Sequence, residues 1–109
     1  KKDLPEYLHY KDNPNVAAIV LISDLGYSLF DGKDIEKYSK KFPLGNHGYD
    51  PTNIDMHGIF YAIGPDFKEG YTCGTLNNID IYPLLAKILS IFPNKNIDGK
   101  FERIEFLLK

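Results

Sequence analysis

The sequence has little cysteine, no long apolar run and no excess of positive charge. Its single cysteine, Cys73, cannot form a disulfide within the chain, so a disulfide scaffold and a cysteine-based zinc finger are both excluded. The redox compartment stays open, because Cys73 could pair with a thiol outside the chain. Thirteen basic and 15 acidic residues give a net charge of -2, which argues against binding to duplex nucleic acid through phosphate neutralisation.

Targeting and membrane-spanning signals are also missing. No run approaches the ~18 apolar residues that a bilayer-spanning helix needs. The first residues, Lys1-Lys2-Asp3, contain neither an initiator Met nor an apolar signal core, and the chain has no Asn-x-Ser/Thr glycosylation sequon. The missing Met leads us to expect a processed product or a piece of a longer protein.

What is present suits one compact, aromatic-rich domain. Hydrophobic residues make up 43% of the 109 residues, and 8 Tyr and 7 Phe can fill much of a core. This length is enough for one domain and too short for two. We therefore treat residues 1–109 as a single segment.

Short apolar segments predict strands of a buried sheet. Residues 16–22 (VAAIVLI) form a continuous, β-branched run of strand length, which is typical of a strand covered on both faces. Residues 58–63 predict a second strand, ended by Gly64-Pro65, and residues 67–71 a third, exposed one. The order of strand, loop, strand and helix fits part of an α/β sandwich.

Residues 79–92 predict the clearest helix. Asn78 or Asp80 can cap its first amides, Pro83 fits in its first turn, and Pro93 ends it. Apolar residues follow the helical period at positions 81, 84, 85, 88, 89 and 92. We read this stripe as core packing and not as a cofactor-binding face.

The remaining segments are shorter and more polar. One or two helical turns are expected over residues 5–10, where Pro5 is followed by Glu6. Residues 31–46 predict a surface loop with one helical turn, and residues 37–41 a solvated lysine-rich stretch within it. Residues 102–108 form a short amphipathic tail of undecided type.

One histidine is placed unusually well for chemistry, in the loop Gly45-Asn46-His47-Gly48-Tyr49-Asp50. Glycines on both sides keep side chains away and permit backbone angles that other residues resist. This arrangement suits an imidazole held against a metal ion or a phosphate. The chain has too few other ligands to complete a metal site around His47.

Further motifs come before and after this loop in a fixed order. They are Leu4-Pro5-Glu6-Tyr7-Leu8-His9-Tyr10, the turn Asp24-Leu25-Gly26-Tyr27, Asp55-Met56, Ile59-Phe60, Gly64-Pro65-Asp66-Phe67, Gly70, Asn78-Ile79-Asp80-Ile81-Tyr82-Pro83-Leu84 and residues 94–99. In this order they resemble the C-terminal part of the catalytic domain of the type I phosphodiesterase/nucleotide pyrophosphatase family, in the alkaline phosphatase superfamily. The resemblance covers nearly the whole chain. Tyr7 stands where the family has Arg, and Pro51 where it has Asn.

The resemblance implies a fold and a chemistry for the parent protein. The fold is an alkaline-phosphatase-like α/β sandwich, in which helices cover a central, largely parallel sheet. Family members hydrolyse phosphodiester or pyrophosphate bonds of nucleotides or lipids with two zinc ions and a Thr or Ser nucleophile. Of the family's six Asp and His zinc ligands only the last has a counterpart here, His47, and the nucleophile is expected upstream.

The same resemblance sets expectations for this chain by itself. It should be catalytically inactive and bind zinc weakly, because one imidazole supplies one of the bonds of a tetrahedral site. Its expected partner is the remainder of its own catalytic domain, and its parent's substrate a nucleotide or a phospholipid-type phosphodiester. Exposed apolar residues at 16–22 would favour self-association. The family suggests a secreted or membrane-anchored location.

Several residues keep a structural alternative beside a functional one. Asp50 could orient the imidazole of His47, although a turn-stabilising role is favoured. His9 is expected to be structural and His57 a surface residue. Asp24 is expected in a turn or cap. We expect Cys73 to be an inert thiol, because nothing near it in the sequence suggests a base.

Two other functions stay open at this stage. The chain could be a non-catalytic interaction module derived from the same fold, which the sequence upstream of Lys1 would decide. It could also come from a superfamily branch that hydrolyses phosphate monoesters. The Gly64-Pro65-Asp66-Phe67 segment and the start of the predicted helix argue against that branch.

Overall fold

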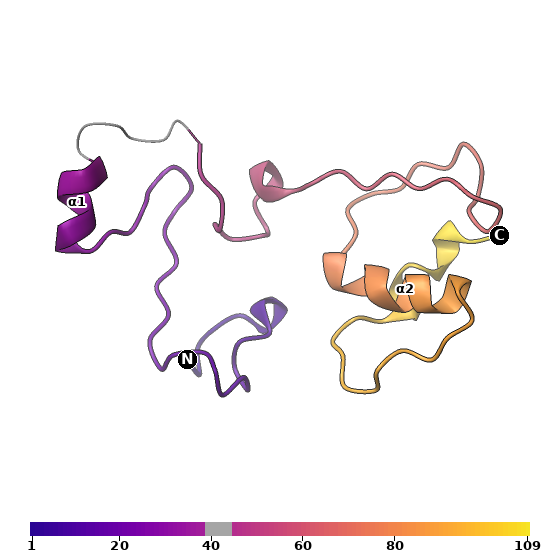
Figure 1. Cartoon of the computed structure of the whole chain (residues 1–109), viewed down its shortest axis with the longest axis horizontal. Coiled ribbons are helices and arrows are strands. Elements are labelled where there is room, and N and C mark those ends of the chain that lie inside the picture. Colours follow the sequence, from indigo (N-terminus) through magenta and orange to yellow (C-terminus); the bar gives the residue numbers. More distant parts are fainter. Residues whose placement is uncertain (39–44) are drawn as a thin grey trace. The chain divides into compact units, whose positions relative to one another are not determined.

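A computed structural model describes residues 1–38 and 45–109. It divides the chain into two compact units, Lys1–Ile59 and Phe60–Lys109, and each is described by itself (Figure 1). Lys40 and Lys41 of the predicted lysine-rich stretch lie outside the described residues.

The first unit contains short helical elements joined by irregular segments. They are a 3-10 turn at Glu6–Leu8, helix α1 at Gly32–Tyr38 and a 3-10 turn at Ile54–Met56. The carboxylate of Asp31 caps α1, because its Oδ1 accepts hydrogen bonds from the N–H groups of Lys33 at 2.9 Å and Asp34 at 3.0 Å. These elements confirm the turn expected near Pro5 and the helical turn expected after residue 31.

The three predicted strands are absent. None of the described residues forms a β-ladder, and Phe67 and Leu108 make only an isolated antiparallel bridge. In the segment 16–22 the Ile19 side chain is 78% exposed, and in the segment 58–63 Ile59 is 95% exposed. A strand needs a neighbour for its N–H and C=O groups, and these segments have none in the described structure. The described residues therefore do not confirm the predicted α/β sandwich.

The second unit has a small core built on one helix. Helix α2 spans Ile81–Ile88 and follows a 3-10 turn at Asn78–Asp80. Two further 3-10 turns, Phe101–Arg103 and Glu105–Leu107, lie beside α2 (Figure 1). The core cluster is formed by Leu84, Ile104 and Leu107. The predicted helix is thus confirmed, and the C-terminal tail of undecided type is a pair of 3-10 turns.

The end of α2 lies earlier than the predicted end at Pro93. Ser90 adopts a left-handed conformation with φ of 54°, and its N–H donates to the Lys87 carbonyl at 3.1 Å. The N–H of Ile91 reaches back to the Ala86 carbonyl at 2.9 Å. This is the hydrogen-bond pattern of a Schellman cap, here with Ser where glycine is usual. The helix stops because its last carbonyls are satisfied there.

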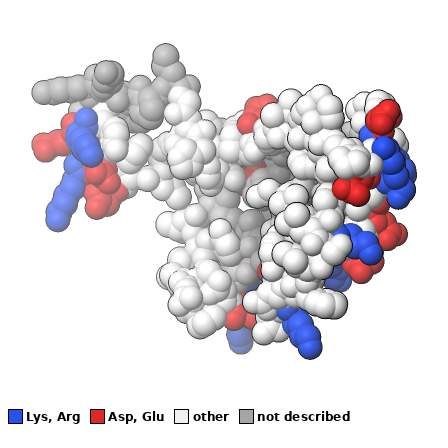
Figure 2. All heavy atoms as spheres, turned by 45° about the vertical axis from the view of Figure 1, so that its right-hand side comes forward, with Lys and Arg blue, Asp and Glu red and all other residues white. Residues whose placement is uncertain are grey.

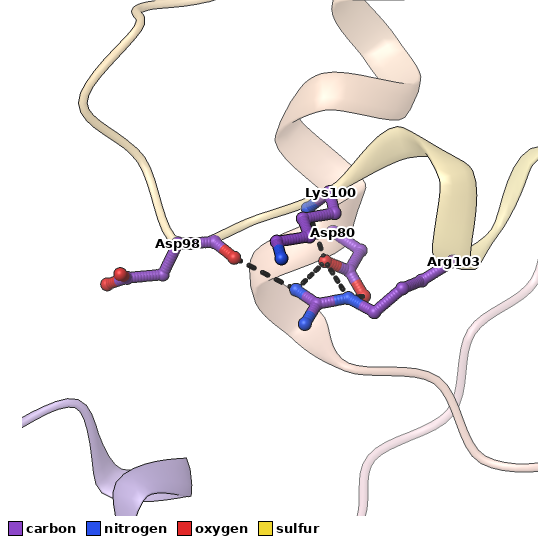
Figure 3. A network of polar contacts seen from close by, with 4 residues as sticks. All are labelled: Asp80, Asp98, Lys100 and Arg103. Carbon is purple, nitrogen blue, oxygen red and sulfur yellow. Dashed lines mark hydrogen bonds and ion pairs between the residues drawn. The ribbon is translucent and has the colours of Figure 1, made fainter.

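Neither predicted capping side chain is found at the start of α2. The Asp80 carboxylate, which is fully buried, is turned instead toward Arg103 and Lys100 (Figure 3). It accepts from Arg103 Nη2 at 2.5 Å and Nε at 2.9 Å, and from the Lys100 backbone N–H at 2.7 Å. Arg103 also donates to the Asp98 carbonyl at 2.9 Å. One carboxylate therefore links the start of α2 to the segment 98–103.

The pKa of Asp80 is lowered by this network. Burial alone would raise the pKa, because it disfavours the charged carboxylate, but the hydrogen bonds from Arg103 and Lys100 outweigh it. A folded-state pKa below the unfolded value stabilises the fold above about pH 4. That contribution is lost as the pH falls through the folded pKa.

Gly99 allows the backbone to approach α2 closely enough for this network. A Cβ built on Gly99 would lie 2.0 Å from the Ile79 carbonyl oxygen and 3.2 Å from the Pro83 ring. The first distance is far inside van der Waals contact and the second is tight by a few tenths of an ångström, so no other residue fits without moving the backbone at Ile79. The glycine places the following N–H, that of Lys100, on the Asp80 carboxylate.

A second apolar stripe of α2 is left uncovered. Some of the predicted core positions are packed and others are exposed. Ile81, Leu84 and Ile88 belong to the core cluster or pack against it. Leu85 and Leu89 are exposed by 48% and 66%, and Phe92 beyond the helix is fully exposed. The core-packing prediction is therefore confirmed for one stripe of the helix and is wrong for the other.

Substituting Asp80→Asn should destabilise the chain by about 2 kcal/mol, because a neutral amide loses the charge-assisted bonds to Arg103. Urea unfolding at pH 7 measures the change. Below pH 4 the free energy of unfolding should also fall less in the variant than in the unaltered chain. Glu105→Gln is the matched control, since Glu105 is an exposed carboxylate of the same unit and is not among the charges that shift the pKa of Arg103. An equal loss in both variants would contradict the proposed geometry.

Substituting Gly99→Ala should destabilise the chain by about 3 kcal/mol, because the added methyl collides with the backbone at Ile79. Gly64→Ala is the control, since its added Cβ would only meet the Phe67 ring at 3.8 Å. The urea midpoints of the two variants give the comparison. A tolerated Gly99→Ala would show that this backbone contact is not tight.

Candidate functional site

The His47 loop presents its imidazole to solvent. His47 is exposed, and its backbone N–H donates to the Asn46 Oδ1 at 2.9 Å. The Asn46 amide also reaches the Ser28 hydroxyl at 3.3 Å. Gly48, which follows the histidine, has a positive φ of 88°. The loop therefore needs a glycine at this position.

Asp50 fixes the turn that follows His47. Its Oδ1 accepts from the Thr52 N–H at 2.8 Å and from the Thr52 hydroxyl at 2.6 Å, and its carbonyl accepts from the Asn53 N–H at 3.1 Å. This Asx turn matches the favoured, turn-stabilising role of Asp50. The hydrogen bonds from Thr52, and then one from Tyr7, hold the pKa of Asp50 below its usual value.

The contact with Tyr7 joins two segments that are distant in sequence. The Tyr7 hydroxyl donates to Asp50 Oδ2 at 2.5 Å, across 43 positions of the chain. The bond to the carboxylate raises the pKa of Tyr7 above 10.0, because ionisation would place two negative charges side by side. Local sequence patterns do not indicate this pair, because its two residues are 43 positions apart.

A shallow hollow of about 290 Å³ lies beside this turn. It joins the end of the apolar segment to the residues after the His47 loop. Its lining residues are Ile22, Ser23, Asp24, Leu25, Tyr49, Asp50, Thr52 and Asn53. The carbonyl of Asp24 accepts the Tyr27 N–H at 3.0 Å, with Gly26 at φ of 85°, which is the turn expected at this position.

The other two histidines and the cysteine have contacts of their own. His57 is an exposed residue, as predicted, and its Nε2 lies 3.1 Å from the Pro51 carbonyl oxygen. His9 ends the first 3-10 turn with φ of 54°, so its role there is structural. Cys73 is a half-buried free thiol packed against the core cluster of the other unit.

The donor chemistry of the loop fits one bond to zinc and no more. A neutral, exposed imidazole is a good zinc ligand, and a tetrahedral site needs three or four protein ligands. Among residues 1–38 and 45–109 there is no group of three His, Cys, Asp or Glu side chains that could hold a metal ion. Any zinc at His47 would therefore need ligands from outside the described part of the chain.

Charged side chains of both signs are mixed on the face drawn in Figure 2. On the face drawn in Figure 2, Lys and Arg side chains lie beside Asp and Glu side chains, with wide uncharged areas between them. A protein that binds a nucleic-acid backbone gathers its basic residues on one face. No described helix is both long and apolar enough to cross a bilayer.

Known proteins similar to this chain include members of the ectonucleotide pyrophosphatase/phosphodiesterase family. Ectonucleotide pyrophosphatase/phosphodiesterase family member 5 of Homo sapiens is 39% identical over 99% of the chain. Family member 7 of Rattus norvegicus is 35% identical over 91%, and human bis(5'-adenosyl)-triphosphatase ENPP4 is 35% identical over 99%. The chain spans about a fifth of the length of these relatives, 21%, 21% and 22% respectively.

These matches confirm the family resemblance. The chain corresponds along nearly its whole length to a segment of the ectonucleotide pyrophosphatase/phosphodiesterase family. No family model matches the chain, and no solved structure matches it either.

The Tyr7–Asp50 pair predicts a linked titration. Substituting Asp50→Asn should lower the pKa of Tyr7 toward 10.0, because the negative partner is removed. The Tyr7 ring signal followed by NMR between pH 8 and 12 measures the change. Asp24→Asn removes another carboxylate at the same hollow and should leave the Tyr7 midpoint in place. A shift in the Asp24 variant alone would contradict the pairing.

Proposed function

We propose that this chain is the segment of a zinc-dependent nucleotide pyrophosphatase/phosphodiesterase that supplies one zinc ligand, His47. The observation that carries the proposal is the family similarity over 99% of the chain together with the exposed imidazole of His47. We also propose that the chain lies in the C-terminal part of the catalytic domain. The proposed fold of the whole protein is the family's α/β sandwich.

The role of this chain in catalysis is to hold the imidazole. Bound zinc ions in such an enzyme stabilise the phosphoryl oxygens and activate the nucleophile and a water. His47 provides a neutral nitrogen for one of them, on a loop shaped by Gly48 and by the Asx turn at Asp50. The Thr nucleophile and the other zinc ligands come from the rest of the parent protein, and the chain alone is inactive.

The exposed apolar side chains support a partner that covers them. In the first unit Ile19 and Leu21 are exposed by 78% and 74%, and in the second Leu89 and Phe92 by 66% and 101%. Apolar surface of this extent is unfavourable in water and is typical of an interface. The remainder of the catalytic domain is the partner that we propose, and self-association is the expected behaviour of the chain without it.

Substrate and location follow from the relatives in general terms. One relative is named a bis(5'-adenosyl)-triphosphatase and others are named ectonucleotide pyrophosphatase/phosphodiesterases. We therefore propose a nucleotide or phospholipid-type phosphodiester as the substrate class. The prefix of those names supports an extracellular or membrane-associated location for the parent.

Substituting His47→Ala in the full-length protein should remove one zinc and lower turnover of a nitrophenyl nucleotide ester more than about 100-fold. Even groups that only orient a metal ligand cost 10–100-fold when removed. Zinc content by mass spectrometry and initial rates are the measurements. His57→Ala is the matched control, because His57 is exposed in the same unit and bonded only to a backbone carbonyl in the described contacts.

Other outcomes would decide against the proposal. Full zinc content in the His47 variant would show that the ligand lies elsewhere. Micromolar, stoichiometric zinc binding or turnover by the 109-residue chain alone would show that the chain is self-sufficient. A parent sequence without an upstream nucleophile would favour the non-catalytic interaction module.

A further inference from the structure

We infer that Tyr7 is a positioning residue for the His47 loop, acting through the carboxylate of Asp50. The inference rests on the proposed role of His47 as a zinc ligand. Its basis is a juxtaposition that crosses the first unit: the Tyr7 hydroxyl, on the 3-10 turn Glu6–Leu8, donates to Asp50 Oδ2 at 2.5 Å.

The two carboxylate oxygens of Asp50 accept hydrogen bonds from different segments of the chain. Oδ1 is occupied by the Thr52 N–H at 2.8 Å and the Thr52 hydroxyl at 2.6 Å, which close the turn after the loop. Oδ2 receives Tyr7 and so connects that turn to a segment 43 positions earlier. The hydrogen bonds from Thr52 determine the conformation of the turn, and the hydrogen bond from Tyr7 fixes the position of the turn within the first unit.

Apart from the hydrogen bond from the Asn46 amide to the Ser28 hydroxyl, the loop has little else to hold it in place. Nothing in the described part of Lys1–Ile59 is buried, so apolar packing does not fix His47. Gly48 in this loop has a positive φ and no Cβ, so the backbone there can sample other conformations. A metal ligand must be held within a fraction of an ångström of its bonding geometry. A tether to Asp50, three positions after the imidazole, reduces that freedom.

The residue type at position 7 fits a tether to a carboxylate. Tyr and Arg differ in shape and charge, and both can donate a hydrogen bond to Asp50. A substitution of Tyr7 by Arg changes the donor and keeps the acceptor Asp50. An Arg at position 7 should therefore restore the contact, and a Phe should remove it.

The test measures loop order and metal retention separately. In the 109-residue chain, amide exchange of Thr52 and Asn53 should be roughly three- to ten-fold faster in Tyr7→Phe, as expected for one lost hydrogen bond. Tyr7→Arg should return it to within about two-fold, and Tyr10→Phe, an exposed tyrosine of the same segment, should not change it. In the full-length protein, zinc loss to a chelator should be accelerated by Tyr7→Phe and restored by Tyr7→Arg.

Each failure has a distinct meaning. Unchanged exchange in Tyr7→Phe would overturn the tether itself. Faster exchange with unchanged zinc loss, in a protein whose His47→Ala variant loses zinc, would leave Tyr7 with a structural role only, and the proposed function would stand. Full zinc retention in His47→Ala would overturn the proposed function, and the positioning role with it.

Discussion

The second unit depends on one buried carboxylate. Asp80 lies at the first turn of α2 and accepts hydrogen bonds from Arg103 and from the backbone at Lys100, so the helix start and the C-terminal turns are fixed to each other. Buried charge is costly unless it is paired and hydrogen-bonded, and here both carboxylate oxygens are occupied. Ile104 follows Arg103 directly, and its side chain enters the core cluster. The ion pair therefore sets the register in which the apolar residues meet.

The first unit is held in a different way. It has no buried residue among those described, and polar contacts between distant segments take the place of a core. Tyr7 with Asp50 is one such contact, and the Asn46 amide with the Ser28 hydroxyl is another. Contacts of this kind are individually weak in water, because each replaces a hydrogen bond to solvent. The order of the His47 loop consequently depends on a few specific side chains.

The sequence predicts those elements whose signals lie within a single segment of the chain. Helix α2 was predicted because its apolar period and its Pro83 are signals within one segment, and the same holds for the turn at Asp24. The segment 16–22 has an equally strong strand signal, but a strand also requires a neighbour that the sequence cannot supply by itself. The Schellman cap at Ser90 was missed because glycine is the usual sign of such an end.

The candidate site shows the same difference between local and distant signals. It also explains why His47, the proposed metal ligand, lies on a backbone segment that few contacts hold. The spacing of Gly48 and Asp50 around His47 could be recognised as a motif, while the 43-residue contact from Tyr7 could not be derived from local pattern. An isolated loop with one imidazole gains little by being rigid. In the function that we propose, the free energy of zinc binding would order the ligands that hold the metal, provided that they are already near their positions. A polar tether such as Tyr7 to Asp50 satisfies that condition without a core, so the loop would be prepared for the proposed metal, whose other ligands would come from the rest of the parent protein.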